Sequence, residues 1–117
     1  MLTVVVIEED AGMQMLIREW LDTAGYHVGS GASEWGADVD LVIIDIPHLR
    51  FQGAQTVREA RASYPRAAMI GISTQLGHSL SGNTVLAVAL RVGRLMSKPL
   101  GRDELLAAVV DAIGPAN

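Results

Sequence analysis

Asp-Leu-Val-Ile-Ile-Asp at residues 40–45 is the stretch of sequence that decides the fold. It is a short, continuous apolar run that ends in a carboxylate, and such a run is typical of a strand buried on both faces of a parallel sheet. A similar run, Thr-Val-Val-Val-Ile at residues 3–7, leads directly into Glu8, Glu9 and Asp10. The two runs predict a parallel sheet whose strands end in acidic side chains.

The rest of the chain alternates between further strand patterns and amphipathic stretches. Strands are expected at residues 26–28, 67–72 and 94–97. A first helix is expected between Asp10, which can cap its start, and Gly25, which can end it, with apolar side chains at helical spacing from Met13 to Leu21. Further helices are expected at residues 54–63, 85–92 and 103–113. Strands that alternate with helices in this way predict a mainly parallel sheet covered by helices on both faces.

Three segments depart from this alternation. Between Val28 and Asp40 there is room for one helical turn at most, so the second helix is expected to be short or missing. Residues 75–84 are rich in Gly, Ser and Asn and predict an extended, mobile loop. Residues 113–117 are expected to form a flexible tail of the single domain 1–117.

Composition excludes several classes of protein. The 117 residues suffice for one domain with a core of its own. The chain has no cysteine, which excludes a disulfide framework and fits a cytoplasmic location. A net charge of −4 without a basic block argues against direct binding of nucleic acid. No apolar run approaches the roughly 18 residues that a membrane span requires.

Polar side chains stand at the predicted carboxyl ends of four strands. Glu8 and Glu9 follow the first strand, Asp45 ends the third, Ser73 follows the fourth and Lys98 follows the fifth. In open α/β sheets, ligands bind beyond this edge. Converging carboxylates repel one another unless a cation lies among them, and Mg²⁺ suits such a site. With a lysine and a hydroxyl nearby, a carboxylate held against the metal is equipped to accept a phosphoryl group.

In the order and spacing of these pieces, the chain resembles the receiver domains of two-component response regulators over nearly its whole length. The resembling segments are Val-Val-Val-Ile-Glu-Glu-Asp at 4–10, the run at 40–45, Gly53, Ile72-Ser73 and Lys98-Pro99. The resemblance implies a flavodoxin-like (βα)5 fold, which is a doubly wound, parallel, five-stranded sheet of order 2-1-3-4-5.

The same resemblance implies a set of site residues. Asp45 would be the phosphoacceptor, Ser73 the switch hydroxyl and Lys98 the cation that pairs with the phosphate. The ligands of Mg²⁺ would be Glu8, Glu9, Asp45 and the backbone carbonyl of Pro47. The phosphoryl donor would be a histidine kinase or a phosphotransfer protein. Such a domain is a signalling module, whose only catalysis is its own phosphorylation and dephosphorylation.

Some positions depart from the family pattern, which makes the chain an atypical receiver. Glu9 stands where a shorter aspartate is usual, and it is expected to weaken binding because Mg²⁺ demands near-octahedral geometry. Asp10 could take its place if the strand end is shifted by one residue. Leu95 stands where the family often has an aromatic residue, and Leu49 stands where it usually has proline.

Three functions are open on the sequence alone. The first is a phosphorylation switch, and the second is a pseudo-receiver that acts as a phosphorylation-independent protein-interaction module. The third is a small α/β enzyme or nucleotide-binding domain, but the first strand is followed by no glycine-rich phosphate loop, and no nucleophile elbow is present. The family often forms homodimers or binds output domains through the face of its fourth helix, fifth strand and fifth helix. Here that face includes Ala87, Leu90, Arg91 and Arg94.

Overall fold

A computed structural model describes residues 2–29, 38–46, 53–76, 80–81 and 85–116. The strands are β1 (Thr3–Ile7), β2 (His27–Gly29), β3 (Leu41–Asp45), β4 (Ala68–Ser73), β5 (Leu80–Ser81) and β6 (Arg94–Ser97). The helices are α1 (Ala11–Thr23), α2 (Gly53–Ser63), α3 (Val85–Leu90) and α4 (Arg102–Ile113). Among these residues, no helix is long and apolar enough to cross a membrane.

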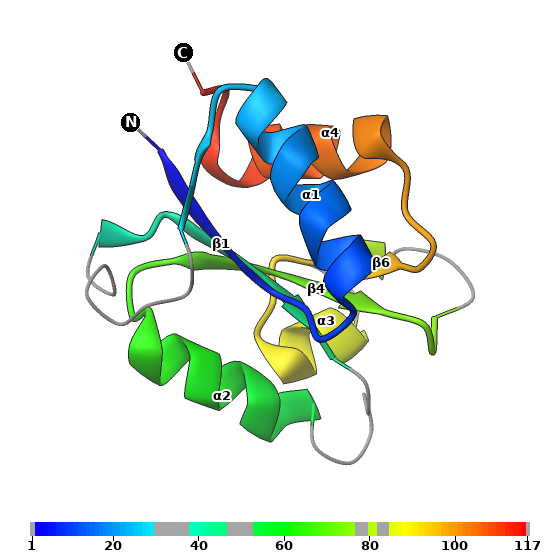
Figure 1. Cartoon of the computed structure of the whole chain (residues 1–117). Helices are drawn as coiled ribbons and strands as arrows, with labels where there is room; N and C mark the ends of the chain where they lie inside the picture. Colours follow the sequence, from blue (N-terminus) through cyan, green and yellow to red (C-terminus); the bar gives the residue numbers. More distant parts are fainter. Residues whose placement is uncertain (1, 30–37, 47–52, 77–79, 82–84, 117) are drawn as a thin grey trace.

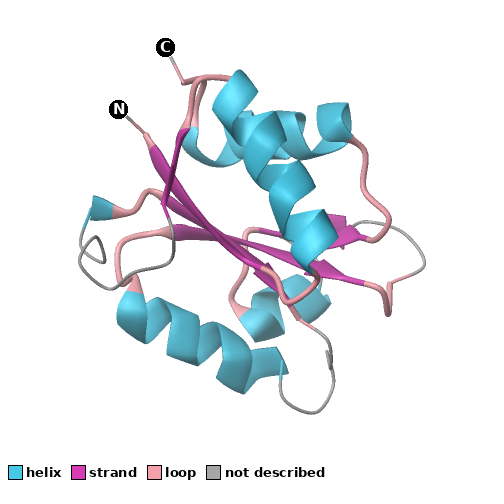
Figure 2. Cartoon of the chain, viewed as in Figure 1, coloured by secondary structure: helices cyan, strands magenta, loops and turns pink. Residues whose placement is uncertain are grey.

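All described strands join one sheet of order β2-β1-β3-β4-β6-β5. The pairs from β2 to β6 are parallel, and only β5 is antiparallel to its neighbour. Helices α1 and α4 cover one face of the sheet, and α2 and α3 cover the other (Figure 1 and Figure 2). Because β6 is the fifth strand expected from the sequence, the predicted doubly wound fold of order 2-1-3-4-5 is confirmed.

One part of the prediction is wrong. The segment 75–84 was expected to be a loop, but it contains β5, whose two residues pair with Leu95 and Arg94 of β6. A strand of two residues leaves no alternating pattern in the sequence, and its pairing depends on the otherwise free edge of β6. The prediction of a short or missing second helix concerns mainly residues 30–37, which lie outside the described residues.

Helix α1 begins and ends at the predicted signals. The Oδ1 atom of Asp10 accepts a hydrogen bond from the backbone N–H of Met13 at 2.9 Å. Gly25 has a φ of 98°, a conformation that glycine adopts without the steric cost of a Cβ. The N–H groups of Gly25 and Tyr26 donate to carbonyls of the last helical turn at 3.0 Å each. This pattern is a Schellman motif, and it turns the chain directly into β2.

Alternating strand side chains divide the core into two layers. The layer beneath α1 and α4 contains Val4, Val6, Ile17, Leu21, Leu41, Ile43, Ile70, Ile72, Met96, Leu105 and Val109. The layer beneath α2 and α3 contains Val5, Val42, Ile44, Ile46, Val57, Ala60, Met69, Ala87, Leu90 and Leu95. Every residue of β3 from Leu41 to Ile44 is buried in one layer or the other, which explains why this strand is apolar throughout.

Candidate functional site

The carboxyl ends of four adjacent strands form one rim of the sheet. Parallel register pairs Ile7 with Ile44, Asp45 with Ile72, and Ser73 with Ser97. Glu8 and Lys98 each follow one of these paired residues, so both reach the rim beside Asp45 although they lie 90 residues apart in the chain. The predicted convergence of strand ends is therefore built by the register of the sheet.

Lys98 bridges two carboxylates at this rim. Its Nζ atom lies 2.8 Å from Oε1 of Glu8 and 2.9 Å from Oδ1 of Asp45. The side chains are largely shielded from solvent, with exposed fractions of 13% for Lys98, 1% for Glu8 and 14% for Asp45. One ammonium thus faces two carboxylates in a poorly hydrated place, and the cluster carries a net negative charge.

The electrostatics keep Lys98 charged. Burial by itself lowers the pKa of Lys98, but its hydrogen bonds to Glu8 and Asp45 and the charges of these carboxylates outweigh this effect. The pKa of Lys98 is therefore raised above its ordinary value of 10.5. At neutral pH the side chain is an ammonium, fixed within hydrogen-bonding distance of Asp45.

Only one of the two carboxylate oxygens of Glu8 has hydrogen-bond partners among the described residues. Its Oε1 atom accepts from Lys98 and, at 3.3 Å, from the backbone N–H of Asp10. Its Oε2 atom is buried and has no hydrogen-bond partner among the described residues. A buried carboxylate oxygen is costly to leave without a partner. This atom is suited to accept a hydrogen bond from water or to contact a cation.

Ser73 lies at the same rim but is engaged with its own loop. The residue is fully buried, and its Oγ atom accepts a hydrogen bond from the backbone N–H of Gln75 at 3.1 Å. Its backbone carbonyl accepts from the N–H of Lys98 at 3.0 Å. Ser73 is thus tied through the backbone to the lysine of the site, and its hydroxyl oxygen holds the turn after β4.

The other predicted metal ligands are placed differently. Glu9 is exposed to solvent, and the carboxylate of Asp10 caps α1. Pro47 lies outside the described residues. In the part of the chain that the structure describes, no three His, Cys, Asp or Glu side chains form a group that could hold a metal ion. The described site therefore contributes two carboxylates, those of Glu8 and Asp45.

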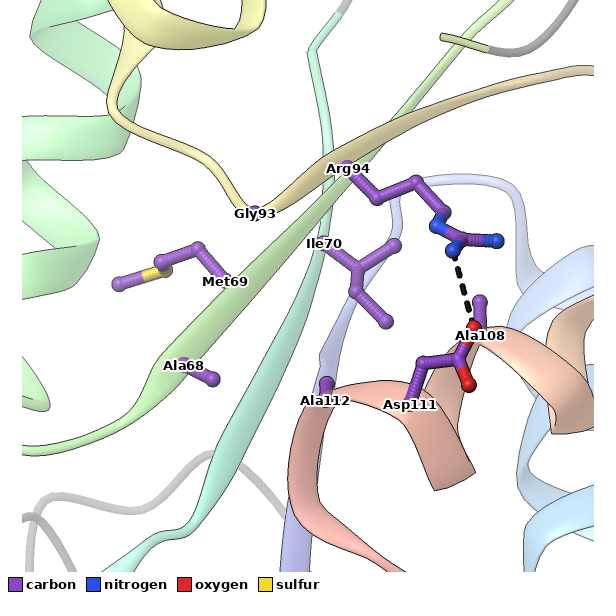
Figure 3. A pocket seen from close by; sticks show the side chains of 8 residues that line it. All are labelled: Ala68, Met69, Ile70, Gly93, Arg94, Ala108, Asp111 and Ala112. Atoms are coloured by element: carbon purple, nitrogen blue, oxygen red, sulfur yellow. Dashed lines mark hydrogen bonds and ion pairs between the residues drawn. The ribbon is translucent and has the colours of Figure 1, made fainter. Parts of the chain in front are cut away.

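The expected docking face also differs from the prediction. Ala87 and Leu90 are buried between α3 and the sheet, with exposed fractions of 0% and 4%. The prediction that they form part of a docking surface is therefore wrong. They face inward because both pack in the core layer that contains Met69 of β4 and Leu95 of β6. Arg94 forms an ion pair with Asp111 of α4, with 3.0 Å between Nη2 and Oδ2 (Figure 3). Only Arg91 is freely exposed among the four residues named for this face.

Comparison with known proteins identifies the fold. No protein-family model and no curated protein matches the sequence. A CheY-like receiver domain protein from Methanospirillum hungatei is 15% identical, with 97% of this chain and 94% of that chain covered and a TM-score of 0.74. A receiver domain protein from Clostridium thermocellum is 22% identical, with coverages of 97% and 94% and a TM-score of 0.73.

A third solved structure widens the range of similar proteins. It is described as a pilus assembly-related protein from Burkholderia pseudomallei, and it is 20% identical, with 97% of this chain and 90% of that chain covered and a TM-score of 0.72. At such identities the likeness concerns the fold. The chain has the CheY-like, flavodoxin-type fold of response-regulator receiver domains.

Proposed function

We propose that the chain is a phosphoacceptor receiver domain, which takes a phosphoryl group on Asp45 from a histidine kinase or a phosphotransfer protein in the cytoplasm. The observation that carries this proposal is the Lys98 ammonium, held 2.9 Å from Asp45 at the carboxyl rim of a receiver-type sheet. Two-component signalling, and not a classical enzymatic activity, is the function that this arrangement supports best.

The residues of the chain have distinct tasks in the transfer. The carboxylate of Asp45 forms a bond to phosphorus while the bond between phosphorus and the donor's imidazole nitrogen breaks, and the imidazole leaves. Lys98 stabilises the negative charge on the transferred group because its ammonium is already fixed beside the acceptor. The Ser73 hydroxyl would hydrogen-bond a phosphoryl oxygen, which requires a change in its contact with Gln75.

A magnesium ion fits the donor set of the site. The unpartnered Oε2 of Glu8 and the carboxylate of Asp45 suit Mg²⁺, which takes one or two carboxylates and keeps several waters. With Glu9 and the backbone carbonyl of Pro47, these two residues would hold the ion, and the longer, exposed Glu9 would weaken binding. When bound, Mg²⁺ would neutralise charge that develops on the phosphoryl oxygens.

The test is activation by beryllofluoride, an analogue of the phosphoryl group, in the presence of Mg²⁺. Amide NMR of the wild type is expected to show shifts at Asp45, Ser73 and Lys98, and a small phosphodonor is expected to add the mass of one phosphoryl group. Asp45→Asn should abolish both effects, whereas Asp103→Asn, a matched change of an exposed aspartate on α4, should abolish neither. A folded wild type with no shifts and no adduct would contradict the proposal.

A second candidate function is a pseudo-receiver that binds partners without phosphorylation. The exposed position of Glu9 favours it, because the described site then brings only two carboxylates to a metal. This candidate predicts no response to beryllofluoride even when Mg²⁺ is abundant. The variant Glu9→Asp separates the two functions. A response gained with Asp at this position would show that the longer side chain had detuned a receiver site.

A further inference from the structure

A hollow of about 290 Å³ is lined by residues of α2, of α3 and of the turn after α3. These two helices cover the face of the sheet opposite α1 and α4 (Figure 1). Three arginines line it, namely Arg58 and Arg61 of α2 and Arg91, which follows α3. The remaining lining residues are apolar: Ala54, Val57, Ala89 and Leu90. A hollow with three cations above an apolar floor has the composition of a binding site for an anion with an organic part.

The arginines of this hollow lack partner carboxylates within the described chain. The ion pairs found there use Arg94, Lys98 and Arg102, and none uses an arginine of the hollow. No described acidic residue lines the hollow either. By contrast, in the hollow between β4, β6 and α4, Arg94 is paired with Asp111 (Figure 3). Three positive charges that pair with no carboxylate of the described residues repel one another, and a bound anion would relieve that repulsion.

The backbone at Arg91 is a second, independent observation. Arg91 has a φ of 61°, in the left-handed region that glycine occupies most easily. It stands at the end of α3, where the N–H groups of Arg91 and Val92 donate to Val88 and Ala87 at 3.1 Å each. This helix-ending turn usually carries glycine at the left-handed residue. An arginine kept in an unfavourable backbone conformation suggests that its side chain has a function there.

The hollow is also organised by a hydrogen bond. Nη2 of Arg61 donates to the backbone carbonyl of Arg91 at 2.7 Å, which joins the last turn of α2 to the end of α3. This contact restrains one guanidinium within the cluster. A restrained guanidinium loses less conformational entropy when it binds, because part of its freedom is already lost.

We propose that this hollow binds a small organic phosphate, a phosphate monoester with a compact apolar or aromatic group. Guanidinium groups bind phosphate through paired N–H donors, and Arg58, Arg61 and Arg91 supply three such forks. Ala54 and Ala89 supply exposed apolar surface for the organic group, and the nearly buried Val57 and Leu90 lie beneath them. A volume of about 290 Å³ is just below the usual range for small-molecule pockets, which restricts the site to a compact ligand.

The site is separate from Asp45. Helix α2 runs from Gly53, near the carboxyl rim, to Ser63, which precedes β4, so Arg61 lies toward the amino ends of the strands. Arg91 precedes the start of β6 and lies toward the same end. The arginine side chains and Asp45 thus belong to different sites, and because binding at the hollow is measured without phosphorylation, each proposal can fail without the other.

The test is calorimetric titration with phenyl phosphate, in EDTA so that no metal-dependent transfer takes place. Parallel titrations use inorganic phosphate and phenol, which carry only one half of the ligand each. Phenyl phosphate is expected to bind more tightly than either. Arg58→Ala is expected to weaken binding about tenfold, the effect of losing one charge-assisted contact. Arg102→Ala, an exposed arginine of α4 that removes the same charge, is the matched control and should leave binding unchanged.

Arg91→Gly separates binding from folding. Glycine relieves the left-handed backbone, so this variant should keep or raise its Tm while it binds phenyl phosphate about tenfold more weakly. Equal binding by wild type, Arg58→Ala and Arg91→Gly would overturn the proposal. So would equal affinity for inorganic and phenyl phosphate, because the apolar floor would then have no role. Binding of a phosphoserine peptide with none of phenyl phosphate would overturn it in favour of a protein partner.

Discussion

Replacement of Lys98 by methionine is expected to destabilise the fold by about 3 kcal/mol. Lys98 lies 2.8 Å from Glu8 and 2.9 Å from Asp45, and at an effective dielectric constant of about 20 each attraction amounts to about 6 kcal/mol. Most of this energy offsets the desolvation of the charges. Loss of one partner from a buried pair costs about 3–5 kcal/mol, and the partial exposure of Lys98 and Asp45 favours the lower end.

Urea unfolding followed by circular dichroism measures this effect. A loss of 3 kcal/mol is large for a domain whose total stability is about 5–15 kcal/mol, and it corresponds to a fall in Tm of about 10 °C. The double variant Glu8→Gln/Lys98→Met should recover about half of the loss, since it removes the most buried unpaired carboxylate. A Lys98→Met protein within about 0.5 kcal/mol of wild type would refute the reasoning.

Asp45→Asn is the control for charge balance in the same experiment. It removes one of two carboxylates that share a single ammonium, so the Glu8–Lys98 pair remains and is balanced. We expect the stability of this variant to lie within about 1 kcal/mol of wild type. If Asp45→Asn lowers the free energy of unfolding as much as Lys98→Met does, then Lys98 does not stabilise the fold by balancing excess negative charge, and the reasoning is contradicted.

Three further predictions concern stability. The pKa of Lys98 is raised above 10.5, so its contribution to the free energy of unfolding is complete below that pH and is lost as the pH rises through the folded-state pKa. Burial also raises the pKa of Tyr26, so ionisation of this residue likewise lowers stability at high pH. Urea unfolding should therefore show stability falling above about pH 10, and less steeply in Tyr26→Phe. Asp10→Ala should cost about 1 kcal/mol by thermal unfolding, through loss of the cap of α1; an unchanged Tm would contradict this. Gly71→Ala should cost about 1–3 kcal/mol of stability, because the added Cβ would lie 2.7 Å from the buried side chain of Ile46 and 2.8 Å from that of Leu95. In the control Gly101→Ala the added Cβ meets nothing within 4 Å, and stability should change little.

The parts of the site that could be predicted are those at strand ends. Asp45 and Lys98 stand next to short apolar runs, and in a parallel sheet all such runs deliver their ends to one rim. The pairing within the rim could not be predicted. Glu8 stays a predicted metal ligand through its Oε2 atom, whereas the bond of its Oε1 atom to Lys98 was not predicted, because it joins residues 90 positions apart. Which of several converging side chains meet depends on the register and packing of distant strands, which no local pattern encodes.

The arginine hollow was missed for a related reason. Arg58 and Arg61 are one helical turn apart and could be placed on one face of α2 from their spacing. Arg91 joins them only because α2 and α3 pack side by side on the sheet. A local signal was present in Arg91 itself, which stands at the end of a helix where glycine is common. A left-handed backbone at a residue other than glycine is visible only in the structure.

The sequence by itself determined the strands β1 and β3, the ends of α1 and the class of the sheet. These features depend on hydrophobic periodicity and on capping residues, which act between neighbours in the chain. Only the tertiary structure decided that Lys98 is shared by Glu8 and Asp45 and that β5 adds an antiparallel edge strand beside β6. The same holds for the burial of Ala87 and Leu90 and for the three arginines that meet between α2 and α3. The physical reason is that these contacts join distant segments, and their existence depends on how the helices and strands pack.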